Sequence, residues 1–279
     1  MKKRTALFNA IKGLIVGSSM LIPGVSGGTM ALILGIYKDL IHAINNFFKD
    51  FKRSFFLLAE FCIGAGLGFL LFARLLDYAM QKFELPLMYF FIGAILGGIP
   101  LLIKQSGVKK GDLKGLAGCG TALLLGAAIV LSLGFIPENI FAFGGGFSIK
   151  SVLMQLLTGI IIAVALILPG ISTSHMLLIL GMYQTMLKAL ENPMGNLVFL
   201  GSLAVSTVIG VFLTTNLLEK AMNKFPQVTY FAIIGFVAGS VIDVFPGFPL
   251  GWEIPVCILT LGAGYAAINF MSKFSEQKE

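Results

Sequence analysis

Residues 21–37 read LIPGVSGGTMALILGIY, a long apolar run that is interrupted in its middle by PGVSGGT. Proline lacks a backbone N–H and glycine is conformationally free, so a helix that enters this run should end near Pro23 and Gly24. The flanks of the interruption are apolar on both sides. The stretch therefore predicts a turn between two helical arms inside a membrane rather than a loop in water.

The composition supports a membrane protein. The chain has 279 residues, of which 57% are hydrophobic and only 12% charged, with a mean hydropathy of +0.94. A soluble domain usually has about a quarter of its residues charged. The formal net charge of +7 sits in short segments between apolar runs, as membrane topology requires, so we expect no nucleic-acid partner. With two histidines and three isolated cysteines, we also expect no metal site and no cofactor.

The chain contains an internal repeat. Residues 13–44 align with residues 159–190 without a gap, and twelve of the 32 positions are identical. The shared PG-x-S and LILG-x-Y are more specific than the matches between Leu and Ile. The similarity continues as RLLDYAMQKF (74–83) over NLLEKAMNKF (216–225). A duplicated half of about 140 residues is therefore predicted.

Each half is expected to contain one broken segment and three continuous transmembrane helices, within a single membrane domain. The first repeat, 1–136, has the broken segment 11–36 and the spans 54–76, 85–103 and 116–136. The second repeat, 137–279, has the broken segment 158–183 and the spans 196–218, 228–245 and 254–270. Residues 38–53 place apolar side chains on one helical face, which predicts a helix on the membrane surface.

The positive charges favour hairpins over crossings for the broken segments. The arms 11–22 and 26–36 have 12 and 11 residues, and each reaches only about half of a bilayer core. If both segments are re-entrant and the N-terminus is cytoplasmic, 16 of the 20 Lys and Arg residues lie inside, whereas two crossings would leave 11 inside. Three crossings per half invert the second half. The expected fold is an all-α integral membrane protein with an inverted-topology internal repeat, each half being one re-entrant helical hairpin plus three transmembrane helices, and with both termini cytoplasmic.

The two hairpin tips are candidate anion sites. Pro23 with Gly24, and Pro169 with Gly170, would form the turns. Exposed backbone N–H groups, hydroxyls and the positive ends of the outgoing helices suit a phosphate. The candidate phosphate-binding residues are Ser26, Gly27, Gly28, Thr29, Ser172, Thr173, Ser174 and His175. In the alternative interpretation, PG-x-S only forms the tight turn that any hairpin needs.

Few charged residues fall within the predicted spans, and these are functional candidates. Glu60 is the candidate to carry a coupling proton or bind a coupling cation, although it can equally be an interfacial carboxylate in water. Asp77 is a second candidate for ion coupling. Arg74 can either meet a phosphate with two hydrogen bonds or extend to the membrane boundary.

One motif points to a different chemistry. Residues 24–28, GVSGG, match the G-x-S-x-G pattern of a serine hydrolase, and His175 follows the second tip. That pattern requires a turn between a strand and a helix, which this sequence does not predict, and no third orienting residue is evident. An intramembrane serine hydrolase is therefore the least favoured alternative, and we expect no catalytic residue.

The segments LIPGVSGGTMALILGIY and LILPGISTSHMLLILGMY resemble the bacterial polyprenyl-phosphate transporter family over essentially the whole chain. This resemblance implies a non-enzymatic translocase that returns undecaprenyl phosphate from the outer to the inner leaflet of the cytoplasmic membrane for envelope polymer synthesis. It gives weight to the first tip and to Pro169, Gly170 and Ser172, whereas Thr173 and Ser174 replace the double glycine in the second tip. Coupling to H⁺ or Na⁺ is expected, because an anion must move against a negative-inside potential. A transporter or channel for a small soluble anion is the main alternative.

Overall fold

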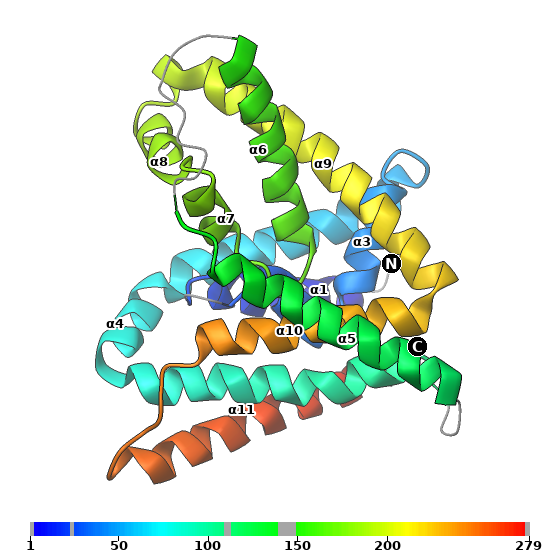
Figure 1. Cartoon of the computed structure of the whole chain (residues 1–279), viewed down its shortest axis with the longest axis vertical. Helices are drawn as coiled ribbons and strands as arrows, with labels where there is room; N and C mark the ends of the chain where they lie inside the picture. The colour runs from blue at the N-terminus through cyan, green and yellow to red at the C-terminus, as the bar shows by residue number, and fades with distance from the viewer. Residues whose placement is uncertain (1–2, 23–24, 109–112, 139–148, 277–279) are drawn as a thin grey trace.

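The computed structural model describes residues 3–22, 25–108, 113–138 and 149–276, and this part of the chain is helical with no strand. Figure 1 shows how these helices are arranged. In chain order they are α1 (Lys3–Ser19), α2 (Gly27–Ile33), α3 (Tyr37–Asn45), α4 (Phe51–Gln105), α5 (Leu113–Gly134), α6 (Ile149–Ile167), α7 (Thr173–Ile179), α8 (Tyr183–Glu191), the 3₁₀ helix η1 (Met194–Asn196), α9 (Leu197–Lys224), α10 (Pro226–Val244) and α11 (Glu253–Glu276).

Four of the described helical segments are long and apolar enough to cross a membrane, judged by length and composition. They are Phe51–Gln105, Ala117–Gly134, Met194–Lys224 and Glu253–Met271. Shorter apolar helices cover Ala6–Ser19, Val152–Ile167 and Pro226–Ile242. The chain is therefore an all-helical protein of the membrane type.

The helices of the two halves correspond in register. α7 begins 146 residues after α2, and α8 begins 146 residues after α3. Residues aligned by this offset, or by the offset of 142 that relates residues 54–105 to residues 196–247, are called counterparts below. The division predicted between 136 and 137 borders residues 139–148, which lie outside the described part, and it stays a prediction.

Both broken segments contain a break followed by a very short helix. α1 ends at Ser19 and α2 begins at Gly27, while Pro23 and Gly24 lie outside the described residues. Ser26 and Ser172 are the N-caps of α2 and α7, and both have extended backbone, with ψ of 134° and 121°. Each outgoing helix has seven residues and stops before Gly35 or Gly181, so it is shorter than the arm expected to reach residue 36. Both glycines have φ of +67°, a left-handed conformation that ends a helix.

The surface helix expected over 38–53 is interrupted. α3 ends at Asn45, residues 46–50 form turns, and α4 begins at Phe51. The Asn46 side chain donates a second hydrogen bond to the carbonyl of His42, which already accepts one from the backbone N–H of Asn46, and such a local side-chain bond competes with continuation of the helix. The prediction of one helix over this range was therefore wrong in length.

α4 folds back on itself. Phe83 has non-helical dihedral angles (φ −138°, ψ 43°) and separates a first arm, 51–82, from a second arm, 84–105. Its counterpart Phe225, with φ −133° and ψ 60°, separates α9 from α10. Figure 1 shows the fold-back of α4 and the junction between α9 and α10 at opposite ends of the molecule.

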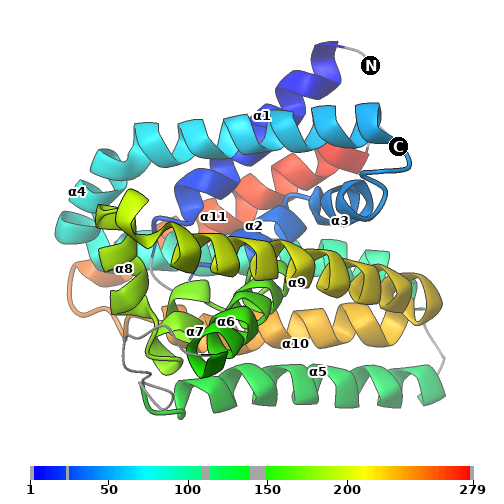
Figure 2. The ribbon, with the colours of Figure 1, turned by 90° about the horizontal axis from the view of Figure 1, so that it is seen from above.

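The two halves interlock through their second and third spans. The second arm of α4 packs against α11, and α10 packs against α5, as both views show (Figures 1 and 2). A Cβ built on Gly93 would lie 2.0 Å from the carbonyl oxygen of Leu261, and one on its counterpart Gly235 would lie 2.1 Å from that of Leu123. Small residues allow this close backbone approach, which is typical of helix pairs in membranes.

Alanine at Gly264 is expected to destabilise this interlock. A Cβ at Gly264 would lie 2.0 Å from the carbonyl oxygen of Phe90, so the two helices must separate, at a cost of about 1–3 kcal/mol. The control is Gly262→Ala on the same helix, because a Cβ at Gly262 meets nothing within 4 Å. Thermal unfolding in detergent should show a lower midpoint for Gly264→Ala alone. Equal midpoints for the two variants would contradict the packing described here.

Candidate functional site

A cavity of about 430 Å³ lies between the two broken segments. One side is formed by the end of α1 and the start of α2, and the other by the end of α6 and the start of α7. Counterparts from the two halves line it, among them Ser26 with Ser172, Gly27 with Thr173, and Met20 with Leu166. The tips of the two halves therefore meet around one shared space.

Six of the residues predicted to bind phosphate line this cavity. They are Ser26, Gly27, Ser172, Thr173, Ser174 and His175. Four of the six carry hydroxyls, which can donate hydrogen bonds to an anion. His175 is the one ionisable residue among the described lining residues, and none of these is acidic. The cavity thus presents donors without a carboxylate that would repel an anion.

Gly28 and Thr29, also predicted to bind phosphate, do not line the cavity. A Cβ on Gly28 would face the carbonyl oxygens of Leu166 and Ile167 at 3.4–3.5 Å. Thr29 is fully buried, and its Oγ1 accepts a hydrogen bond from the backbone N–H of Gly170 at 2.9 Å. This bond joins the first tip to the turn of the second, where Gly170 has φ of +82°.

A second buried hydrogen bond links the same elements. The hydroxyl of Tyr37 donates to the carbonyl oxygen of Ile167 at 2.5 Å. Ile167 is the last residue of α6, so the bond satisfies a carbonyl that has no partner within the helix. The shared LILG-x-Y motif contained this tyrosine, but the sequence did not indicate that it would bind the opposite half.

The two N-cap serines are used differently. The Oγ of Ser172 accepts a hydrogen bond from the backbone N–H of His175 at 3.4 Å, which caps α7. The Ser26 side chain makes no cap hydrogen bond to α2. The first tip therefore offers a serine hydroxyl that is not used by its own helix.

The charged candidates lie away from the cavity. Arg74 and Asp77 are exposed on the first arm of α4, where Asp77 accepts a hydrogen bond from Gln81 at 3.0 Å. Glu60 is half-buried on the same arm, and its Oε2 accepts a hydrogen bond from the Asn9 side chain at 2.9 Å. None of the three lines the cavity.

The contact of Glu60 has an uncharged equivalent in the second half. The counterpart of Glu60 is Ser202, and that of Asn9 is Gln155. The Ser202 hydroxyl donates to the Gln155 side chain at 2.7 Å. The repeat thus preserves a polar contact between the first helix and the first long span, and only one copy carries a charge.

The structure brings the serine and the histidine of the hydrolase alternative to one cavity, but it does not arrange them as catalytic residues. Ser26 and His175 line the same cavity, as the pattern of residues allowed. In the described part of the chain no hydrogen bond joins them, and no carboxylate lies at the cavity to orient the histidine. That part also contains no group of three or more His, Cys, Asp or Glu side chains placed to hold a metal ion.

Sequence reasoning missed the apolar walls of the cavity. The apolar lining residues are Met20, Leu21, Ile22, Val25, Leu166, Ile171 and Leu178. The signal for them was weak, because apolar residues occupy most positions in both broken segments. The cavity therefore has apolar walls as well as polar lining residues.

Comparison of the sequence with known proteins places the chain in a family. The family model described as undecaprenyl phosphate translocase-like matches residues 16–250. The chain belongs to this family. A polyprenyl-phosphate transporter of Staphylococcus aureus (strain NCTC 8325 / PS 47) is 30% identical over 264 residues, covering 91% of this chain and 92% of that protein. A second polyprenyl-phosphate transporter, from Vibrio cholerae serotype O1, is 26% identical over 260 residues, covering 88% and 79%.

The undecaprenyl phosphate translocase-like match spans both tips and both sides of the cavity. It confirms the family expected from the PGVSGGT segment and its repeat. No solved structure matches the chain.

Proposed function

We propose that this protein moves a polyprenyl phosphate, undecaprenyl phosphate in particular, from the outer to the inner leaflet of the bacterial cytoplasmic membrane, for use in envelope polymer synthesis. The observation that carries the proposal is the cavity between the tips, with its hydroxyls, its histidine and its lack of acidic residues. The names of the two curated relatives support the same substrate class.

The head group is proposed to enter the cavity while the polyprenyl tail stays in lipid. A phosphate monoester carries between one and two negative charges near neutral pH and has several acceptor oxygens. Ser26, Ser172 and His175 would donate to these oxygens. α2 and α7 have only seven residues each, so the hydroxyl, imidazole and backbone donors matter more here than the helix dipole that the sequence suggested.

We propose an inverted-topology repeat with two re-entrant hairpins as the architecture of transport. The opposite positions of the α4 fold-back and the α9–α10 junction support inversion (Figure 1). α1 begins and α11 ends at the same end as that junction, where both termini would be cytoplasmic. Motion of one repeat relative to the other would then expose the cavity to each leaflet in turn.

Inward movement of the anion requires an energy source. The negative-inside potential opposes it by about 2.3 kcal/mol per charge per 100 mV. We propose coupling to H⁺ or Na⁺ through Glu60, whose half-buried carboxylate is held by Asn9. Its place outside the cavity allows coupling without direct competition with the phosphate.

Glutamine at Glu60 is expected to slow gradient-driven transport by about tenfold while changing head-group affinity less than about twofold, because the amide cannot bind and release a cation. The measurement pairs a flux assay under an imposed pH or sodium gradient with a binding titration in detergent. The control is Ser202→Ala, which alters the uncharged counterpart contact. Weaker lipid binding with an unchanged response to the gradient would contradict the coupling role.

The proposed substrate is tested by reconstitution into vesicles. Purified protein should move undecaprenyl phosphate between leaflets faster than protein-free vesicles do, and undecaprenol, which lacks the phosphate, should not compete. Movement of a soluble anion without movement of the lipid would instead support the small-anion alternative. Ser26→Ala should retain partial transport, whereas a serine hydrolase would lose all activity.

A further inference from the structure

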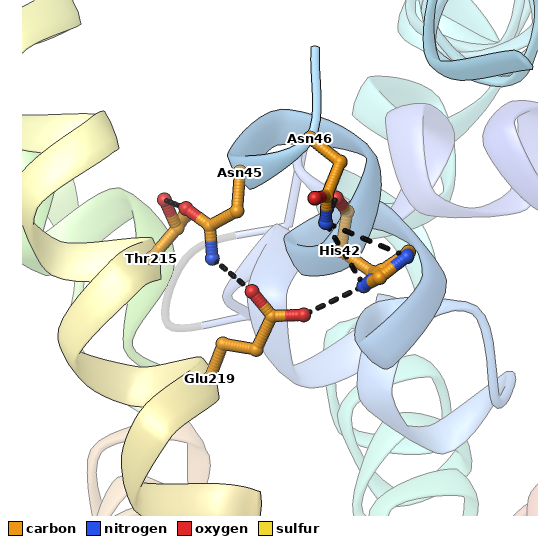
Figure 3. A network of polar contacts seen from close by, with 5 residues as sticks. All are labelled: His42, Asn45, Asn46, Thr215 and Glu219. Carbon is orange, nitrogen blue, oxygen red and sulfur yellow. Dashed lines mark hydrogen bonds and ion pairs between the residues drawn. The ribbon is translucent and has the colours of Figure 1, made fainter. Parts of the chain in front are cut away.

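A polar network joins α3 to α9 (Figure 3). Glu219 lies at its centre, with one carboxylate oxygen 2.7 Å from Nδ1 of His42 and the other accepting a hydrogen bond from Asn45 at 2.6 Å. The hydroxyl of Thr215 donates to the Asn45 side chain at 2.7 Å. This contact ties the first repeat to the second at the end of the molecule where α9 meets α10.

The equivalent contact, between α8 and the first arm of α4, is absent from the described part of the structure. By the repeat offsets, α8 corresponds to α3 and the first arm of α4 corresponds to α9. The counterparts of His42 and Glu219 are Lys188 and Asp77, and both are exposed. Within the described residues, the hydrogen bond recorded for Asp77 is to Gln81 of its own helix, and α8 makes no packing with α4 comparable to that of α3 with α9.

Residues of α3 and α9 are more buried than their counterparts on α8 and the first arm of α4. Ile41 on α3 is 2% exposed, whereas its counterpart Leu187 on α8 is 41% exposed. On the long helices, Thr215 is fully buried, and its counterpart Ala73 is only partly covered. Two copies of one structural unit are thus held in two different states of contact.

The surfaces of α8 and of the first arm of α4 that would form the equivalent contact carry charges of both signs. Lys188 and Glu191 lie three residues apart and so share a face of α8, and Arg74 and Asp77 share a face of α4 in the same way. In the α3–α9 contact, a higher residue number on α3 meets a lower number on α9. The same antiparallel register places Lys188 opposite Asp77. Glu191, the counterpart of Asn45, then lies between Asp77 and position 73, which is next to Arg74, so two basic side chains meet two carboxylates.

We propose that the protein has a second conformation in which α8 packs on the first arm of α4, with Lys188 paired to Asp77 and Glu191 paired to Arg74, while α3 separates from α9. This inference rests on the proposed transport function. The two contacts lie near the α9–α10 junction and near the α4 fold-back, which are at opposite ends of the molecule (Figure 1). Exchange of one contact for the other therefore changes the end from which the cavity is reached.

Disulfide trapping tests the exchange in the full-length protein. In a chain in which Cys62, Cys119 and Cys257 are replaced by alanine, one variant carries Asn45→Cys with Thr215→Cys and another carries Asp77→Cys with Lys188→Cys. Both pairs should form disulfides in vesicles, and each disulfide should stop transport until it is reduced. The control pair, Leu70→Cys with Lys188→Cys, should not react, because residue 70 lies two turns from residue 77.

Weakening the contact between α3 and α9 should increase the population of the proposed second conformation. Glu219→Ala in the Asp77/Lys188 cysteine pair should raise its rate of disulfide formation at least about threefold, since the Glu219 carboxylate contacts both His42 and Asn45 of α3. An unchanged rate, or a rate no higher than that of the control pair, would overturn the inference.

A charge exchange gives a second readout that needs no cysteine. Asp77→Lys alone should slow transport about threefold to fivefold, and Asp77→Lys combined with Lys188→Asp should restore at least half of the parent rate. Failure of the double variant to recover overturns the proposed pair. A cysteine-free parent that moves no polyprenyl phosphate would count against the proposed function, whereas a transporting parent without the Asp77–Lys188 disulfide counts against this inference alone.

Discussion

Leucine at Gly27 should reduce polyprenyl phosphate transport by at least about tenfold while the protein stays folded, a loss equivalent to about 1.4 kcal/mol of head-group binding. Gly27 lines the cavity, and the three atoms nearest to a Cβ built on it all belong to the side chain of Met20, with Sδ at 2.9 Å. Methionine is flexible and can move aside for one carbon. The further carbons of leucine must then occupy the space proposed for the phosphate.

Alanine at Gly27 is the matched variant, and its transport should stay within about twofold of the parent because a movement of Met20 accommodates it. Gly66→Leu, on a glycine whose Cβ meets nothing within 4 Å, controls for added bulk elsewhere. Vesicle flux and the thermal midpoint should be measured on all three. Parent-like flux in a folded Gly27→Leu protein would show that the head group does not pass between α2 and α7.

Leucine at His175 should weaken binding of polyprenyl phosphate by about tenfold or more, because hydrogen bonds to a charged group contribute about 1.5–3 kcal/mol. The backbone N–H of His175 is fixed by Ser172, and the imidazole lies at the cavity. The substitution removes a ring donor and keeps a side chain of similar size. Affinity for undecaprenyl phosphate in detergent is the direct measurement.

Glutamine at His175 should recover part of the lost affinity, because its amide still donates a hydrogen bond. Undecaprenol should bind equally to the parent and both variants, since it has no phosphate. An unchanged affinity of His175→Leu for the phosphate lipid would remove His175 from the site.

The repeated motifs were enough to predict the helical membrane fold and the two positions where a helix is interrupted. PG-x-S gave N-cap serines at corresponding positions, and six of the nine residues predicted to bind phosphate, Arg74 among the nine, line one cavity. The early end of the outgoing helices was also encoded, because Gly35 and Gly181 both occur in the LILG repeat. A glycine that follows an apolar helical run commonly ends the helix, so the arm predicted to reach residue 36 was too long.

The packing partners of the helices could not be read from the sequence. Gly93 with Gly97, and Gly235 with Gly239, form G-x-x-x-G patterns that predict a close helix contact. The pattern does not say which helix approaches. Only the structure shows that each pair faces a helix of the other half.

The difference between the two halves was equally hidden. α3 and α8 have similar sequences, and local preference gives no reason for one to pack on a long helix and the other to remain exposed. Which of the two helices packs on a long helix depends on the conformation of the whole protein, because two such arrangements can differ in free energy by only a few kcal/mol.

The most direct test of the central claim is protection of a cysteine in the cavity by the lipid head group. In the cysteine-free chain, Ser174→Cys places an exposed thiol at the cavity, and Met194→Cys, 82% exposed and outside it, is the control. Undecaprenyl phosphate should slow maleimide labelling of residue 174 at least about fivefold, undecaprenol should not, and residue 194 should react equally in both lipids. Equal labelling of residue 174 with and without the phosphate lipid would contradict a head-group site between the tips.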